Sequence, residues 1–254
     1  IHAGEGEHLV KSVAEHFNVA RSTANRALQT LVKENWLKKT NGTRPLYSLG
    51  ENRQISKTYS LKDLEEDIVW SRDFKPIFNL PKNIYDIAQF GFTEILNNAI
   101  DHSEGDFVSV WMAVEDKQLR IIISDDGIGI FKKISEAMKL PDPRLSILEL
   151  SKGKFTTDPK NHSGQGIFFT SRMFDRFQIE SGDLVYDHDI VRENDYFYDV
   201  DHVNGGTLVF MRISTDSTRT SKEIFDEYTT DKEDYGFDKT VVPVRLAVFG
   251  NENL

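Results

Sequence analysis

Apolar and polar positions follow a helical period over residues 92–103. Apolar side chains recur at i, i+3, i+4, i+7 and i+8, which predicts one buried stripe of an α-helix: Phe92, Ile95, Leu96, Ala99 and Ile100. The opposite stripe has the same spacing and consists of Glu94, Asn97, Asn98 and Asp101. A solvated helix face normally mixes lysine with glutamate and avoids asparagine, a weak helix former. A face of two carboxylates and two amides, with no cation, therefore indicates a chemical role.

Two strand-like runs follow this helix, at residues 107–114 and 119–124, and the turn 115–117 joins them. Asp125 stands at the end of the second run, and Gly127 and Gly129 come directly after it. Glycines allow the backbone to turn tightly beside a strand end. Taken alone, such a D-x-G-x-G pattern is common at strand ends and identifies no function.

A second pair of glycines, Gly164 and Gly166, ends the polar loop of residues 151–166 and leads into a predicted helix. Glycines before a helix leave its first N–H groups free to bind phosphate oxygens. A last apolar strand is predicted over residues 205–214, with Thr207 near its start.

These four elements, in this order, resemble the GHKL ATPase superfamily of gyrase B, HSP90, histidine kinases and MutL over roughly residues 85–214. The resemblance implies an α+β fold, a two-layer α/β sandwich of the Bergerat type, which binds ATP or ADP with Mg²⁺. Glu94 would activate the attacking water, and Asn98 would ligate Mg²⁺. The remaining implied nucleotide contacts are Asp125 to the adenine amino group, Gly127 and Gly129 beside the base, Gly164, Gln165 and Gly166 at the phosphates, and Thr207 in a water-mediated adenine contact.

The resemblance leaves the fate of the phosphate open. Many histidine kinases lack the glutamate base, so Glu94 favours water as the acceptor and hence Mg²⁺-dependent ATP hydrolysis. Residues 51–80 also contain no histidine that could accept a phosphate. Two alternatives remain: a protein kinase of the anti-sigma or histidine kinase type acting on a STAS-type partner, and an ATP-sensing DNA binder without turnover.

Charge separates the first 50 residues from the rest of the chain. Residues 1–50 hold seven Lys/Arg and four Asp/Glu, a net charge of +3, whereas the remainder holds 24 and 37, a net charge of −13. Residues 12–50 read as helix, turn, helix and hairpin, which resembles a bacterial winged helix-turn-helix. Ser22 is expected to cap the second helix, and the helix is expected to pack inward through Ala27, Leu28, Leu31 and Val32. This head is expected to bind double-stranded DNA through the second helix and the hairpin tip, with contacts from Arg21, Thr23, Asn25, Arg26 and Arg44. The alternative is a protein-docking module.

The remaining segments complete the expected organisation: a helical connector over 51–80 with Ser60 as a helix cap, the ATPase domain over 81–214, and a third segment over 215–254. The third segment predicts a helix at 222–228 and an apolar strand at 241–249. It resembles the start of a STAS-like domain and is expected to contact a protein partner, unless its strand joins the ATPase sheet. The acidic run 183–201 is interpreted as a solvated hairpin insertion, with a metal cluster as the alternative.

Composition adds the expected compartment. The chain has 254 residues and no cysteine, which excludes disulfides and thiolate catalysis. It contains no apolar run of the ~20 residues that a bilayer requires, so we expect no membrane partner. A bacterial, cytoplasmic regulator of transcription is the resulting hypothesis.

Overall fold

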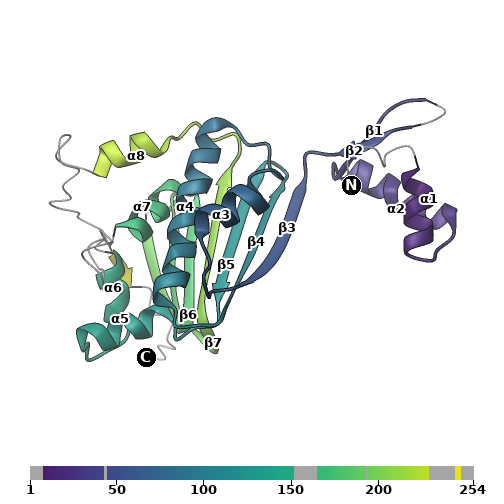
Figure 1. The fold of residues 1–254 in the computed structure, drawn as a ribbon. Coiled ribbons are helices and arrows are strands. Elements are labelled where there is room, and N and C mark those ends of the chain that lie inside the picture. Colours follow the sequence, from purple (N-terminus) through teal and green to yellow (C-terminus); the bar gives the residue numbers. More distant parts are fainter. Residues whose placement is uncertain (1–7, 43–44, 152–164, 193, 229–243, 247–254) are drawn as a thin grey trace, which may run out of the picture. The chain divides into compact units, whose positions relative to one another are not determined.

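The structure is a computed structural model that describes residues 8–42, 45–151, 165–192, 194–228 and 244–246 (Figure 1). The chain divides into two compact units. The first contains residues 1–54 together with 113–117, and the second contains residues 55–112 and 118–254. No helix in the described ranges has both the length and the apolar character that a membrane span needs.

The first unit has the predicted order of helix, turn, helix and hairpin. It consists of α1 (Leu9–His16), α2 (Arg21–Lys33), β1 (Leu37–Lys39) and β2 (Tyr47–Leu49), with β1 and β2 antiparallel. One small core holds these elements together, formed by Leu9, Leu28, Leu37 and Tyr47. The pairing of two helices with a hairpin agrees with the predicted elements, and their assignment as a winged helix-turn-helix stays a prediction.

Two details of this unit differ from the prediction. Ala20, not Ser22, precedes the first residue of α2, and no side chain caps the helix. The buried positions of α2 are Ala24 and Leu28, four residues apart. Because the inward stripe follows this spacing, Leu31 lies on the flank of the helix and is exposed.

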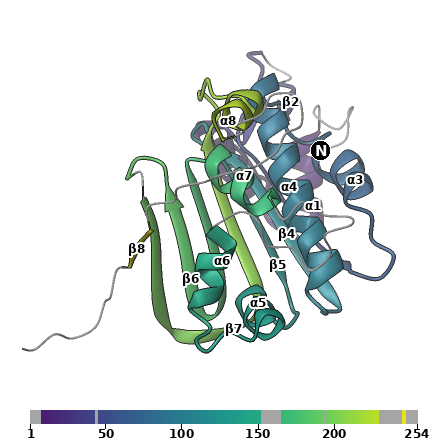
Figure 2. The same cartoon turned by 90° about the vertical axis from the view of Figure 1, so that its left-hand side faces the viewer.

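The second unit is built on one mostly antiparallel sheet with helices on one of its faces (Figure 2). Its strands are β3 (Arg53–Ser60), β4 (Phe107–Glu115), β5 (Gln118–Asp125), β6 (Arg176–Asp189), β7 (Asn194–Ser214) and β8 (Val244–Leu246), in the order β3-β4-β5-β7-β6, with β8 beside β7. The helical layer includes α4 (Lys82–His102), α5 (Ile130–Met138), α6 (Leu145–Ser151) and α7 (Gly166–Met173), and α8 (Ser221–Tyr228) packs on α7. Burial alternates along β5, where every second residue faces the helices. The described residues therefore form the predicted two-layer α/β arrangement.

The prediction of a helical connector over 51–80 is wrong for its first part. Residues Arg53–Ser60 form the edge strand β3, and the following helical segment, α3 (Glu66–Val69) with the π-helix η2 (Trp70–Phe74), begins only after Ser60. Alternation of partly buried and exposed side chains along β3 is typical of a strand. The helical segment packs on α4, since the ring centroids of Trp70 and Phe74 both lie 5.0 Å from that of Phe92.

Asp73 fixes the π-helix to β3. Its buried carboxylate accepts hydrogen bonds from Lys57 Nζ at 2.6 Å, Tyr59 Oη at 2.9 Å and Arg72 Nη2 at 2.8 Å. Arg72, Lys57 and Tyr59 hold the pKa of Asp73 well below its ordinary value against the opposing effect of burial. The segment between β3 and α4 is therefore anchored to the sheet by charge as well as by aromatic packing.

β6 and β7 form a long antiparallel ribbon that folds back on itself. The register shifts between Ser181 and Leu184, and Gly182 has a positive φ of 64°. The Ile190 amide donates to the Asp175 carbonyl at 3.0 Å, which places the tip of the ribbon beside its own start. β8 pairs in parallel with Asp195–Phe197 of β7, so this strand joins the sheet of the second unit. The segments around β8 lie outside the described residues, and a STAS-like domain stays a prediction.

The interpretation of residues 183–201 as a solvated hairpin is wrong in one respect. The hairpin exists, but Asp187, His188 and Asp195 are buried rather than solvated. Two arginines, Arg172 and Arg176, pair with the buried aspartates. Within the described ranges no group of three or more His, Cys, Asp or Glu could hold a metal ion, so the alternative of a metal cluster finds no support there.

Candidate functional site

The half-buried part of the polar stripe of α4, formed by Glu94, Asn97 and Asn98, is the floor of the candidate site. Phe92, Ile95, Leu96 and Ala99 are between 0 and 4 % exposed and anchor the opposite side of the helix in the core. Glu94, Asn97 and Asn98 are half-buried as a result, whereas Asp101 is exposed. Asn98 Nδ2 donates to the Glu94 carbonyl at 2.8 Å. This bond uses the donor side of the amide and presents the Oδ1 acceptor to other partners.

Asp125 and Thr207 meet where β5 ends beside β7. Asp125 Oδ1 accepts hydrogen bonds from the Gly127 amide at 2.9 Å and from the Thr207 amide at 3.2 Å, and Thr207 Oγ1 accepts the Ile130 amide at 3.0 Å. Burial raises the pKa of Asp125, although the two amides oppose this effect. A buried carboxylate with one oxygen fixed by amides can offer its other oxygen to a hydrogen-bond donor.

Two glycines permit the backbone contacts of this region. A Cβ on Gly127 would lie 2.0 Å from the carbonyl oxygen of Ser103, at the end of α4. Gly206 has a φ of +81°, and a Cβ there would lie 2.1 Å from the carbonyl oxygen of Asp125. Only glycine can therefore bring the loop after β5 so close to α4 and to β7.

Glu94 lies at the start of α7. A Cβ on Gly166 would stand 1.8 Å from Glu94 Oε2, so the carboxylate lies directly against the first residue of the helix. The helices approach this closely because Gly91 of α4 faces Phe174, where a Cβ would be 2.6 Å from the ring. Gln165 precedes α7, and no side chain caps the helix. Its first N–H groups and its dipole favour an anion at this position.

The predicted nucleotide contacts thus form two groups along α4. Asp125, Gly127 and Thr207 lie together near its C-terminal end, and Glu94, Gln165 and Gly166 lie together at its middle. Gly129 has a φ of +88° and turns the chain into α5. Gly164 lies outside the described residues.

Sequence reasoning missed three residues of the site: Ser103, Ser181 and Gly206. The backbone carbonyl of Ser103 accepts a hydrogen bond from the Ile128 amide at 2.9 Å, and Ser181 Oγ donates to the Gly206 carbonyl at 2.8 Å. The glycine pair Gly205-Gly206 directly before Thr207 could have indicated the third. The two serines carry no local signal, because their roles arise from contacts distant in sequence.

The predicted DNA contacts lie on the first unit. Arg21, Thr23 and Arg26 are exposed on α2, and Asn25 is half-buried. Arg44 lies outside the described residues.

Comparison with protein-family models gives a match. The family model described as histidine kinase-, DNA gyrase B-, and HSP90-like ATPase matches residues 86–217. No individual curated protein matches the chain. The family match contains α4 from Asp86 onward, the loop after β5, the start of α7 and Thr207, which form the two groups described above. Because it spans 132 of the 254 residues, the protein belongs to the family of histidine kinase-, DNA gyrase B- and HSP90-like ATPases.

Proposed function

We propose that this protein is a Mg²⁺-dependent ATPase whose nucleotide state regulates a DNA-binding head, and thereby transcription. Family membership already provides ATP binding and an activity of the ATPase or kinase type. The observation that favours hydrolysis is the position of the Glu94 carboxylate against Gly166, at the anion-favouring start of α7. A carboxylate beside the terminal phosphate can take a proton from a water molecule that attacks the phosphorus.

The residues at the other end of α4 suit an adenine base. Asp125 is held as an acceptor by two amides, and its buried position restricts the competition from water. The exocyclic amino group of adenine is a donor that such a carboxylate recognises, whereas guanine presents a carbonyl oxygen at the equivalent position. This part of the site therefore supports ATP over GTP.

The donor set fits Mg²⁺ through Asn98. Mg²⁺ prefers oxygen ligands and is commonly held by one or two protein groups together with substrate phosphates. The bond from Asn98 Nδ2 to the Glu94 carbonyl leaves the amide oxygen as the ligand that Asn98 can provide. When bound, the ion neutralises the charge on the phosphates; Glu94, one helical turn away, would hold the proton removed from water.

Incubation with γ-labelled ATP and magnesium tests the proposed reaction. Release of labelled phosphate supports hydrolysis. Transfer of the label to a protein without free phosphate would establish the kinase alternative, and binding without either product would leave an ATP sensor.

The basic α2 supports a DNA-binding head. Replacing Arg21 and Arg26 by alanine is expected to weaken retardation of a cognate duplex at least about tenfold and to reduce the salt slope by about 1 to 2, since each phosphate contact contributes about 0.9. Electrophoretic mobility shift at several salt concentrations measures both effects. ATP binding should survive, because the second unit holds the nucleotide site.

A matched control removes the same charge elsewhere on the unit. Lys11 and Lys38 are exposed and pair with Glu15 at 3.7 Å and Glu51 at 3.2 Å. Their double alanine variant should keep nearly wild-type DNA binding. If the Arg21 and Arg26 variant binds DNA as tightly as this control, the first unit is a protein-docking module instead.

A further inference from the structure

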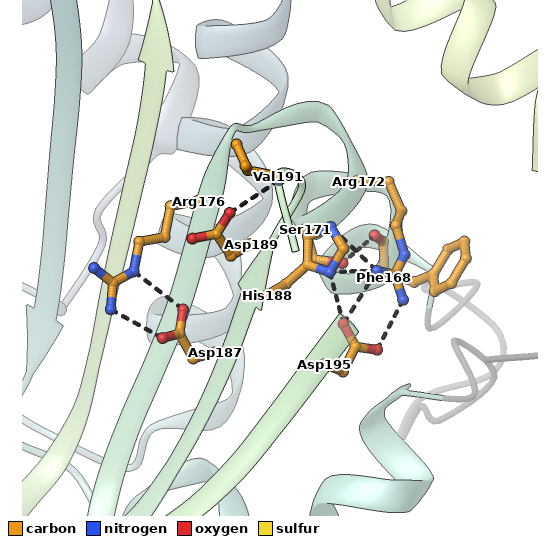
Figure 3. Close-up of polar contacts among 9 residues, drawn as sticks. All are labelled: Phe168, Ser171, Arg172, Arg176, Asp187, His188, Asp189, Val191 and Asp195. Atoms are coloured by element: carbon orange, nitrogen blue, oxygen red, sulfur yellow. Dashed lines mark hydrogen bonds and ion pairs between the residues drawn. The ribbon is translucent and has the colours of Figure 1, made fainter. Parts of the chain in front are cut away.

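A buried ionic network holds the C-terminal end of α7. Arg172 Nη1 and Nη2 donate to the two oxygens of Asp195 at 3.1 and 2.9 Å, and His188 Nδ1 lies 2.6 Å from Asp195 Oδ1 (Figure 3). Asp195 is 1 % exposed and His188 5 %. Arg172 Nη1 also contacts the His188 ring, 2.5 Å from Nδ1 and 3.2 Å from Nε2. The network therefore ties the helix to both strands of the folded-back ribbon.

Figure 3 also shows a second arginine–aspartate pair in the same ribbon. Arg176 Nε and Nη2 donate to the two oxygens of Asp187 at 3.1 and 2.9 Å, so this pair is also bidentate, although it uses Nε and Nη2 where Arg172 uses Nη1 and Nη2. Adjacent residues of a strand point to opposite faces of a sheet, so Asp187 faces away from the side on which His188 meets α7. Arg176 and Asp187 both belong to β6. The two pairs are thus chemically alike, but only one reaches the helical layer.

α7 connects the network to the phosphate end of the site. Gly166, at its first turn, contacts Glu94, and Arg172 lies six residues later, about 9 Å along the axis at 1.5 Å per residue. The Phe168 ring lies under the Arg172 guanidinium at 5.2 Å, which fixes the side chain along the helix. A short helix moves as one body, so the network that holds one end also sets the place of the other.

We propose that Arg172, held by Asp195 and His188, is a positioning residue that places the N-terminus of α7 against the phosphates of bound ATP; this inference rests on the proposed nucleotide function. A buried ion pair contributes little net stability compared with apolar residues of the same size. Its bidentate fork does fix orientation, which apolar packing does not do as strictly. The adenine contacts of Asp125 and Thr207 lie on other elements and do not depend on this helix.

Two isosteric substitutions separate positioning from stability. Asp195→Asn should lower the affinity for Mg·ATP about tenfold and leave the affinity for adenosine within about twofold, because the proposal brings only the phosphates against α7. Asp187→Asn, the matched control, should leave both affinities within about twofold. Calorimetry measures Mg·ATP binding, and NMR titration at millimolar concentration measures adenosine. Arg172→Lys, which keeps the charge but loses the fork, should lower the Mg·ATP affinity by about threefold with the same selectivity.

The ratio of the two affinities decides the proposal. Unchanged Mg·ATP affinity in Asp195→Asn, or an equal loss of both affinities, would overturn it. Circular dichroism reports whether Asp195→Asn folds; if it does not, the same ratio in Arg172→Lys decides. Wild-type protein that binds neither ligand would instead overturn the nucleotide function itself, so the two failures are distinguishable.

Discussion

ATP turnover is expected to fall by about 10²- to 10⁴-fold when Glu94 is replaced by glutamine, which is the usual contribution of a general base. Glutamine keeps the size and the hydrogen-bonding capacity of the side chain but cannot take the proton of the attacking water. Nucleotide affinity should stay within a few-fold of the wild type, because the base acts only in the transition state. Steady-state phosphate release gives the rate, and calorimetry with Mg·ATP gives the affinity.

Two variants on the same helix face sharpen this result. Asn98→Ala should weaken Mg·ATP binding itself, since it removes an oxygen ligand, so the two variants should differ in which constant changes. Asp101→Asn removes a carboxylate two helical turns from Glu94, at an exposed position, and should leave turnover unchanged. Hydrolysis at the wild-type rate in Glu94→Gln would place water activation on another residue.

Local periodicity was sufficient to predict the parts of the fold that bury one face. The stripe that contains Phe92 and Leu96 is buried in α4, and the alternating run before Asp125 is the strand β5. These predictions succeed because burial imposes the period of 3.6 or 2 directly on the sequence. β3 was missed because an edge strand buries little on either face, and its alternation of partly exposed residues is weak.

Contacts between distant segments could not be predicted in this way. Arg172 and Asp195 are 23 residues apart, and their pairing requires the ribbon of β6 and β7 to fold back, which follows from the register shift near Gly182. The acidic composition of residues 183–201 led to the prediction of a solvated hairpin, because composition alone does not reveal that two arginines outside this run pair with two of its aspartates in the interior. The residues of the candidate site were predicted from motifs, whereas the bonds from Ser103 to Ile128 and from Ser181 to Gly206 join segments distant in sequence.

Asp125→Asn is expected to weaken ATP binding by about 10- to 100-fold and at the same time to stabilise the protein without nucleotide. The Gly127 and Thr207 amides would keep the oxygen of the asparagine in the place of Oδ1, so the new NH₂ group would face the adenine amino group, donor against donor. A lost hydrogen bond to a charged group costs about 1.5–3 kcal/mol. Calorimetry with each nucleotide should show that the affinity for ATP falls relative to the affinity for GTP.

The stability change has a definite sign and pH range. Burial raises the pKa of Asp125, so the folded state must ionise a carboxyl group that prefers to stay protonated, and the wild type loses stability as pH rises above the ordinary carboxyl value of about 4. Asparagine removes this penalty, so the variant should unfold at a higher temperature at pH 7, and the difference should vanish below about pH 4. Thermal unfolding at several pH values measures this.

Asp126→Asn provides the opposite sign at the adjacent position. The Phe107 and Asp106 amides donate to Asp126 Oδ1, both at 2.9 Å, and lower the pKa of this exposed carboxylate. Its stabilising contribution is present above the ordinary carboxyl pKa and is lost as the pH falls, so Asp126→Asn should destabilise the protein at pH 7 and leave ATP affinity unchanged. If Asp125→Asn loses stability as this control does, the ionised Asp125 carboxylate stabilises the fold, and the proposal that it costs stability in exchange for binding adenine is wrong. If it binds ATP as tightly as the wild type, Asp125 does not contact the base.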